Sequence, residues 1–252
     1  MSTAPTLRRA ATLALSATAL ALTVACSGGG TATATDTVTS STTTTTTTTS
    51  PAPSAAATSA SPATVPAGAG TATTVDLDGD GAPDTLWLAD VDGTRELGVR
   101  TATGGSSVEF TSAAPQAASA SAAVLASRAP VVLLDTGRSV QVYVYRAESG
   151  LGPVRGVEGQ QYSFSLGFTG YGTGLVCEPE ADGLHLYGEN ATSDDADLFT
   201  VTRTEVTVSA EHSTATNGDT QTLGAGLSAD DPLVQAAHGT TCGDGGVASE
   251  PA

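Results

Sequence analysis

Short runs of apolar and β-branched residues, separated by Gly, Asp and Asn, follow one another from residue 75 to residue 209. Runs of this length with turn residues between them predict β-strands rather than helices. The expected strands are 85–88, 96–100, 107–111, 131–134, 140–146, 161–166, 174–177, 184–187, 198–202 and 205–209. The pattern therefore predicts an all-β domain built from antiparallel hairpins.

One short helix is expected near the C-terminus. Asp230 or Asp231 can cap its first turn, Pro232 suits the first helical position, and a glycine follows its weak apolar face. The segment 113–126 combines Ala, which favours helix, with many Ser residues, and is expected to be coil or a short irregular strand. The last residues, 246–252, are expected to form a disordered tail.

The first third of the chain is too poor in large apolar residues to form a core. Residues 1–25 place Arg8 and Arg9 before an apolar stretch that is too short for a comfortable membrane span, which is the layout of a signal peptide. Residues 26–74 are almost entirely Thr, Ala, Ser, Pro and Gly and predict a disordered stalk, either O-glycosylated or unmodified. The β-domain is therefore expected at 75–245.

The negative net charge of the chain argues against anionic partners. The whole chain has a formal net charge of −17, and because all 26 acidic residues but only seven of the nine arginines follow residue 25, the remainder carries 7 − 26 = −19. A chain this acidic is a poor match for nucleic acid or for an anionic lipid surface. Solubility and affinity for divalent cations are the properties that this charge favours.

Residues 22–26, Leu-Thr-Val-Ala-Cys, resemble a bacterial lipobox. The resemblance implies cleavage before Cys26 and a lipid anchor on the outer face of the cell membrane, where two acyl chains give stable attachment. The alternative is an ordinary secretory signal with an unrelated cysteine. If Cys26 is lipidated, Cys177 and Cys242 remain as a pair in an oxidising compartment, which favours a disulfide over two free thiols.

The segment 76–84 has the donor pattern of a calcium loop, with carboxylates at positions 1, 3, 5 and 9, Gly at position 6 and a backbone carbonyl at position 7. An EF-hand is excluded because Trp87 stands where the bidentate Glu is required. A solvated turn without metal is the alternative, although four unneutralised carboxylates would repel one another. The expected ligands of a structural Ca²⁺ are Asp76, Asp78, Asp80 and Asp84 through their side chains and Ala82 through its carbonyl.

This loop resembles the Asp-x-Asp-x-Asp-Gly-x-x-Asp loop of FG-GAP, or VCBS-type, repeats, which occur in β-propellers and in many secreted bacterial proteins. The resemblance implies Ca²⁺ binding by the residues named above and propeller-like hairpins. Segments 82–100 and 129–143 form a loose internal repeat with an offset of 47 residues. Too few blades fit in the chain to close a propeller, which takes four or more, so an incomplete arrangement is expected.

Catalytic signatures are missing from the sequence. His185, His212 and His238 stand in no recognised catalytic or zinc spacing, and no Gly-x-Ser-x-Gly elbow is present. The alternating Tyr162 and Phe164 are expected in the core rather than in a sugar-stacking platform. The expected function is therefore a non-enzymatic, lipid-anchored module that binds or presents an envelope or extracellular ligand. The alternatives are an envelope hydrolase acting on glycan or peptide, and a ligand-free structural spacer.

Overall fold

The computed structural model describes residues 64–166, 173–194, 196–211 and 213–251. The predicted signal peptide, Cys26 and most of the predicted stalk lie outside these residues. Within the described part of the chain, no helix has both the length and the apolar character needed to cross a membrane.

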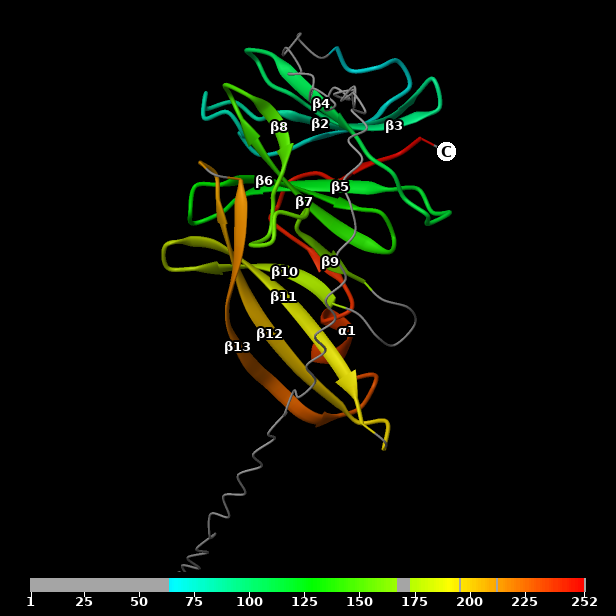
Figure 1. The fold of residues 1–252 in the computed structure, drawn as a ribbon, viewed down its shortest axis with the longest axis vertical. Coiled ribbons are helices and arrows are strands. Elements are labelled where there is room, and N and C mark those ends of the chain that lie inside the picture. The colour runs from blue at the N-terminus through cyan, green and yellow to red at the C-terminus, as the bar shows by residue number, and fades with distance from the viewer. Residues whose placement is uncertain (1–63, 167–172, 195, 212, 252) are drawn as a thin grey trace, which may run out of the picture. The chain divides into compact units, whose positions relative to one another are not determined.

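The described residues form three sheets, each containing an antiparallel meander of four consecutive strands (Figure 1). The prediction of an all-β fold of antiparallel hairpins with one short helix is confirmed. A meander of four strands is also the unit from which propeller blades are made. The first sheet contains β1 (Gly70–Thr73), β2 (Thr85–Val91), β3 (Thr94–Arg100) and β4 (Gly105–Glu109).

The second and third sheets have additional short strands at their edges. The second sheet contains β5 (Ser119–Val124), β6 (Pro130–Asp135), β7 (Ser139–Arg146) and β8 (Gly150–Pro153), with β9 (Ser163–Ser165) paired to β7 and β15 (Ala248–Ser249) paired to β5. The third contains β10 (Thr173–Glu180), β11 (Gly183–Ser193), β12 (Phe199–Ser209) and β13 (Thr214–Leu227), with β14 (Thr240–Thr241) parallel to β10.

The second sheet has a hydrophobic core on each of its faces. On one face, Val132 and Leu134 pack with apolar residues of the first sheet, and on the other, Val131 and Leu133 pack with those of the third. All four side chains of this run are fully buried or nearly so. A strand covered on both faces carries a continuous apolar run instead of an alternating one, which explains the Val-Val-Leu-Leu sequence of β6.

The two copies of the internal repeat form strands at the same position in the first and second sheets. Segment 82–100 contains β2 and β3, and segment 129–143 contains β6 and most of β7. These are the second and third strands of the four-stranded meander in each sheet. In the first copy Asp92 and Gly93 form the connecting turn with φ of 54° and 84°, a left-handed pair typical of tight hairpins.

The C-terminal residues form a strap, defined here as residues 240–250, that contacts the first strand of every sheet. β14 pairs with β10, the N–H of Gly246 donates to the carbonyl of Thr73 at the end of β1 (3.0 Å), and β15 pairs with β5. The predicted disulfide is confirmed and joins the strap to β10 through Cys177 and Cys242. The expectation of a disordered tail from residue 246 was wrong, because backbone hydrogen bonds and the fully buried Ala248 hold a segment that lacks an apolar pattern.

Several boundaries also differ from prediction. β1 lies inside the segment assigned to the stalk, and β5 lies inside the Ala- and Ser-rich segment 113–126. The two strands expected at 198–202 and 205–209 are a single strand, β12, because its polar Arg203 and Thr204 continue the ladder rather than form a turn. The long edge strand β13 was not predicted, since Thr, Gly and Asp interrupt its pattern.

The helix and the aromatic alternation follow the prediction. Helix α1 (Pro232–Ala236) begins after Asp231, whose side chain accepts a hydrogen bond from the N–H of Leu233 (2.9 Å). Its buried Val234 packs in a small cluster on the third sheet. Phe164 is buried in the core between the second and third sheets, and the partly buried Tyr162 packs against that core.

Candidate metal loop and adjacent cavity

The acidic loop connects β1 and β2 and is closed at its base by the backbone. The N–H of Thr74 donates to the carbonyl of Asp84 (2.8 Å), and the N–H of Asp84 donates to the carbonyl of Val75 (3.4 Å). Within the loop, Leu77 is buried in the core shared by the first and second sheets. The loop is therefore fixed at its two ends and at one internal apolar residue.

Asp76 organises the turn of the loop. Its Oδ1 accepts hydrogen bonds from the N–H groups of Gly79 (2.7 Å) and Asp80 (3.2 Å), and its Oδ2 accepts from that of Gly81 (2.7 Å). Gly79 and Gly81 have φ of 79° and 88°, a conformation that residues with a Cβ rarely adopt. The glycines thus allow the chain to wrap around one carboxylate.

Three of the predicted ligands converge. One carboxylate oxygen from each of Asp76, Asp78 and Asp84 lies within 4.8 Å of the others, and such a group can hold a metal ion. Burial is the main reason that the pKa of Asp84 is raised, and the neighbouring carboxylates of Asp78 and Asp76 raise it further. A divalent cation at this point would relieve both the burial cost and the repulsion.

Two surrounding hydroxyl groups support Asp78. Its Oδ2 accepts a hydrogen bond from the hydroxyl of Thr103 (3.0 Å), which lies 3.2 Å from the hydroxyl of Thr101. Although burial acts in the opposite direction, these hydroxyl groups hold the pKa of Asp78 below its usual value. The Asp78 carboxylate is therefore oriented by its neighbours and kept ionised, as a metal ligand must be.

Asp80 and Ala82 lie outside this group of three. Asp80 is exposed, and its Oδ1 accepts the N–H of the exposed Ala82 (2.7 Å), so its side chain stabilises the turn. Their roles as ligands therefore stay predictions. The assignment of the metal as Ca²⁺ likewise stays a prediction.

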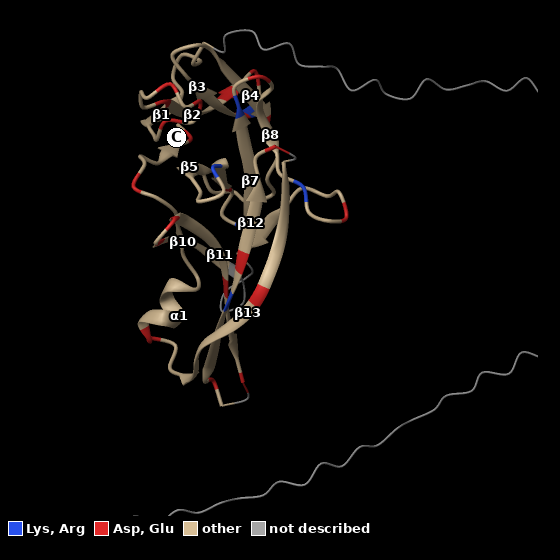
Figure 2. Ribbon diagram, turned by 90° about the vertical axis from the view of Figure 1, so that its left-hand side faces the viewer, with Lys and Arg blue, Asp and Glu red and all other residues tan. Residues whose placement is uncertain are grey.

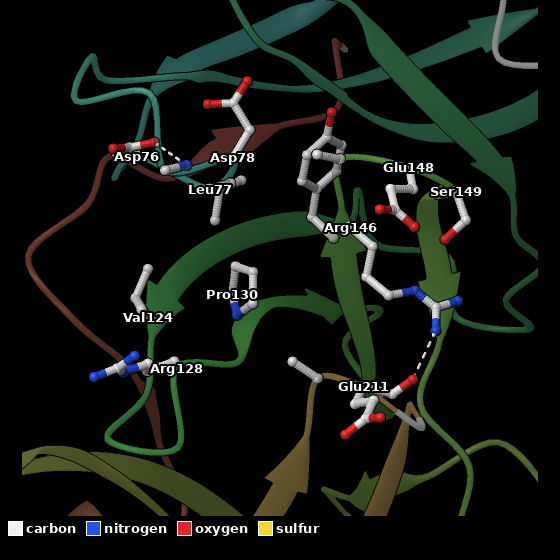
Figure 3. A pocket seen from close by; sticks show the side chains of 14 residues that line it. Asp76, Leu77, Asp78, Val124, Arg128, Pro130, Arg146, Glu148, Ser149 and Glu211 are labelled. Carbon is white, nitrogen blue, oxygen red and sulfur yellow. Dashed lines mark hydrogen bonds between the residues drawn. The ribbon is translucent and has the colours of Figure 1, made fainter.

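A cavity of about 890 Å³ lies beside the loop (Figure 3). Its walls come from the loop of the first sheet, the β5–β6 and β7–β8 turns of the second sheet, and the turn that follows β12 in the third sheet. Apolar residues form part of the lining, charged residues of both signs form another part, and Gly79 and Ser149 complete it. The apolar lining residues are Leu77, Val124, Pro130, Tyr145, Ala147 and Ala210, and the charged ones are Asp76, Asp78, Arg128, Arg146, Glu148 and Glu211.

The two arginines of the cavity point away from one another (Figure 3). Arg146 donates a hydrogen bond from Nη1 to the backbone carbonyl of Glu211 (3.4 Å), whereas the exposed Arg128 stands at a turn position with φ of 62°. Tyr145 is buried at the cavity wall, and burial raises its pKa, to which the charges of Asp78 and Asp84 add. The negative charges of the loop therefore act on a side chain that lines the cavity.

Sequence reasoning identified the loop but not the cavity. The loop is a continuous motif, whereas the cavity is formed by turns from three sheets. The scarcity of basic residues was the available signal: Figure 2 shows few blue segments among many red ones, and two of the seven arginines beyond residue 25 line this cavity.

A second acidic group lies at the β10–β11 connection, the position in the third sheet that the metal loop occupies in the first. Glu180, Asp182 and His185 are close enough there to hold a metal ion. However, the two ring nitrogens of His185 lie 2.9 Å from carboxylate oxygens of Glu205 and Asp182. Hydrogen bonds to Glu205 and then to Asp182 raise the pKa of His185 to about 9. This arrangement is an imidazolium held by two carboxylates, which leaves no ring nitrogen free for a metal.

Among the described residues, the other histidine is His238, which is not part of this acidic group. His238 lies edge-on to Phe199, with ring centroids 6.4 Å apart, and His212 lies outside the described residues. His185 is on the face of the third sheet opposite its buried neighbour Leu186, and its side chain is only 19% exposed because of its ion pairs.

No protein-family model, curated protein or solved structure matches the chain.

Proposed function

We propose that this protein is a lipid-anchored module of the cell envelope, whose β-domain is stabilised by Ca²⁺ in the 76–84 loop and binds a ligand in the cavity beside that loop. The observation that carries the proposal is the convergence of Asp76, Asp78 and Asp84 in a loop that also forms a wall of the cavity. A bound cation would fix the loop and thereby the shape of the cavity.

Calcium is favoured by the chemistry of the donors. The converging atoms are all carboxylate oxygens, and hard oxygen ligands suit Ca²⁺ better than metals that prefer nitrogen or sulfur. The position of the loop immediately before β2 and the meander of four strands agree with the resemblance to FG-GAP repeats. Calcium is also plentiful outside the cell, so modest affinity suffices there.

The proposed location rests on the sequence. The signal-peptide layout, the lipobox-like residues 22–26 and the predicted stalk favour a domain outside the cytoplasm, tethered through Cys26. A disulfide between Cys177 and Cys242 suits an oxidising compartment. The partner is then an envelope or extracellular molecule.

A hydrolase is the competing class, and the described side chains give it little support. The two nitrogens of His185 are both engaged by carboxylates, so that neither can take a proton from a hydroxyl or from water. No histidine is among the described residues that line the cavity. The size and apolar lining of the cavity favour binding over the role of a ligand-free spacer.

The test is calcium titration and thermal unfolding of the lipid-free mature chain carrying Cys26→Ser. Wild type is expected to bind Ca²⁺ and to unfold at a higher temperature in Ca²⁺ than in chelator. Asp78→Asn and Asp84→Asn should abolish this difference, whereas Asp182→Asn, in the other acidic group, should retain it. A wild type whose unfolding is indifferent to chelation would refute the metal site.

A further inference from the structure

The cavity beside the metal loop offers a ligand two charges that the protein itself does not use. The acids of the loop are engaged within it, Arg146 donates a hydrogen bond to the backbone carbonyl of Glu211 (3.4 Å), and Glu211 is engaged as well. Arg128 and Glu148 are exposed, and among the described residues neither side chain forms a hydrogen bond or an ion pair. The charges left for a ligand are therefore one positive and one negative.

Arg128 stands at a position where the backbone favours glycine. The described residues with positive φ are ten glycines, two aspartates, Arg128 (62°) and Ser213. A residue with a Cβ is strained in this conformation, and such strain is concentrated at functional sites. In the described part of the chain, no contact of the Arg128 guanidinium offsets the strain. An arginine kept at such a position therefore points to a partner outside the chain.

Both charges are carried by turns that are held in place from outside the cavity. In the β5–β6 turn, the hydroxyl of Ser127 donates to the carbonyl of Val208 (2.8 Å), which ties the turn to the third sheet. At the end of the β7–β8 turn, the N–H of Leu151 donates to the hydroxyl oxygen of Ser106 on β4 (2.6 Å), which ties the turn to the first sheet. The two charged side chains lie on different sides of the cavity (Figure 3). The turns that position them are therefore preorganised for a ligand.

Accessible apolar groups lie beside each of the two charges. Val124 and Pro130 are opposite each other in the β5–β6 ladder, at the base of the turn that carries Arg128. Val124 is 39% exposed and Pro130 is half-buried. On the other turn, the exposed Ala147 directly precedes Glu148. The ligand that fits this wall has an apolar body between two opposite charges.

The positions of the charges select among zwitterionic ligands. A free amino acid carries both charges on one carbon atom, and a zwitterionic lipid carries both in one head group, whereas the two charges of the cavity belong to different turns. A short peptide separates its α-ammonium from its α-carboxylate and places its side chains between them. Arginine binds a carboxylate through two parallel hydrogen bonds, and a cavity of about 890 Å³ is in the usual range for ligands of this size.

We propose that the cavity binds a short peptide with apolar side chains, whose α-carboxylate pairs with Arg128 and whose α-ammonium pairs with Glu148. This inference rests on the proposed function, in which the same cavity is the ligand site. It adds the chemical class of the ligand and the two residues that recognise its ends.

The experiment is calorimetric titration of the lipid-free mature chain carrying Cys26→Ser in excess Ca²⁺. The probes are the peptide Leu-Ala-Leu, its N-acetylated form, its C-terminal amide, and Ser-Ser-Ser. Wild type is expected to bind Leu-Ala-Leu at least tenfold more tightly than each of the others. Arg128→Gln should abolish the preference for the free carboxylate and keep that for the free ammonium, and Glu148→Gln should do the reverse. The controls Arg100→Gln and Glu158→Gln, exposed and outside the cavity, should change neither preference.

A glycine variant separates a binding role of Arg128 from a structural one. Arg128→Gly removes the charge and also relieves the positive φ, so it should unfold at the same or a higher urea concentration than wild type. It should nevertheless lose the preference for the free carboxylate, as Arg128→Gln does. An arginine needed only for the fold would give lower stability in Arg128→Gly, which would contradict the proposal.

Three binding results would overturn the proposal. The first is a wild type that binds Leu-Ala-Leu no more tightly than its blocked forms or Ser-Ser-Ser. The second is a cost of amidation or acetylation that is the same in both cavity variants as in wild type. The third is tighter binding of leucine or of dihexanoylphosphatidylcholine, which would place the cavity in another ligand class.

The failure of this inference can be distinguished from the failure of the metal site. A Ca²⁺-dependent rise in the unfolding temperature without peptide binding would reject the peptide and leave the metal site standing. Peptide binding with the expected end-group preferences, in a chain whose unfolding is indifferent to chelation, would reject the metal site and leave the peptide standing.

Discussion

Glu250, near the end of the chain, joins the first and second sheets through one carboxylate. It accepts hydrogen bonds from the Nε and Nη2 atoms of Arg95 on β3, and a third from the N–H of Ala118 before β5 (2.6 Å). The Arg95 and Glu250 side chains are 22% and 10% exposed. Because Glu250→Ala removes the acceptor of all three hydrogen bonds, it is expected to weaken the attachment of the strap to both sheets.

The magnitude of this effect follows from the burial of the pair. Exposed ion pairs contribute up to about 1 kcal/mol, and removing one partner of a fully buried pair costs about 3–5 kcal/mol. A pair that is mostly but not fully buried lies between these limits, so Glu250→Ala should lower the free energy of unfolding by about 2–3 kcal/mol. Arg95→Ala should cost about 0.5–1 kcal/mol more, because it also removes the guanidinium from the Phe110 ring.

The assay is urea unfolding of the two single variants and of the double variant, which isolates the interaction between the two side chains. A coupling free energy of about 1–2 kcal/mol is expected. Glu158→Ala, in an exposed turn, is the control and should change stability by less than about 0.5 kcal/mol. Additive effects of the two single variants would refute the reasoning.

The same pair has a signature in the dependence of stability on pH. Burial acts to raise the pKa of Glu250, but the hydrogen bonds from Arg95 and the Ala118 N–H outweigh it and hold the pKa below its ordinary value of 4.5. A lowered folded-state pKa contributes stability above the unfolded-state pKa, and this contribution is lost as the pH falls through the folded-state pKa. Wild type should therefore lose more stability than Glu250→Ala on acidification below about pH 4.5.

Three further predictions concern other parts of the fold. Reducing the disulfide, whose cysteines are 65 residues apart in sequence, should lower the free energy of unfolding by about 4 kcal/mol, as measured by urea unfolding with and without reductant. The His185 ion pairs should stabilise the protein below pH 6.5 and lose this effect as the pH rises through about 9, so the stability difference between wild type and His185→Gln should vanish by about pH 10. A Cβ at Gly98 would lie 2.1 Å from the Trp87 ring, so Gly98→Ala should shift the tryptophan fluorescence and destabilise the protein by about 2 kcal/mol or more, whereas Gly104→Ala, where a Cβ meets nothing within 4 Å, should do neither.

Elements with strong local signals were predictable from the sequence. Neighbouring residues explain three of these elements: the apolar run predicts strand β6, the capping Asp231 and Pro232 predict helix α1, and the closely spaced acids predict the loop. β5 was harder, because the side chains that it buries include Ala120 and Ala122, which are small and favour helix. The segment becomes a strand because β6 and β15 pair with its two edges, and that information lies elsewhere in the chain.

In the candidate site, too, only the residues that are close in sequence could be predicted to lie together. Asp76 and Asp78 could be placed together because their spacing along the chain brings them to one loop. Arg128 and Arg146 belong to different turns of the second sheet and reach the same cavity only through the packing of the sheets. No sequence pattern of a single segment contains such a relation, so the cavity could be recognised only from the structure.

The third sheet packs one face against the second sheet, and its other face is covered in two ways. At one end of that face, α1 packs over Phe199 and Val201. At the other end, the sheet carries ion pairs instead of apolar residues, among them Arg203 with Glu178 and His185 with its two carboxylates. A sheet face that no other sheet covers avoids a large apolar patch, which would promote association. The acidic group around His185 is therefore accounted for by its place on the uncovered part of this face, without a metal.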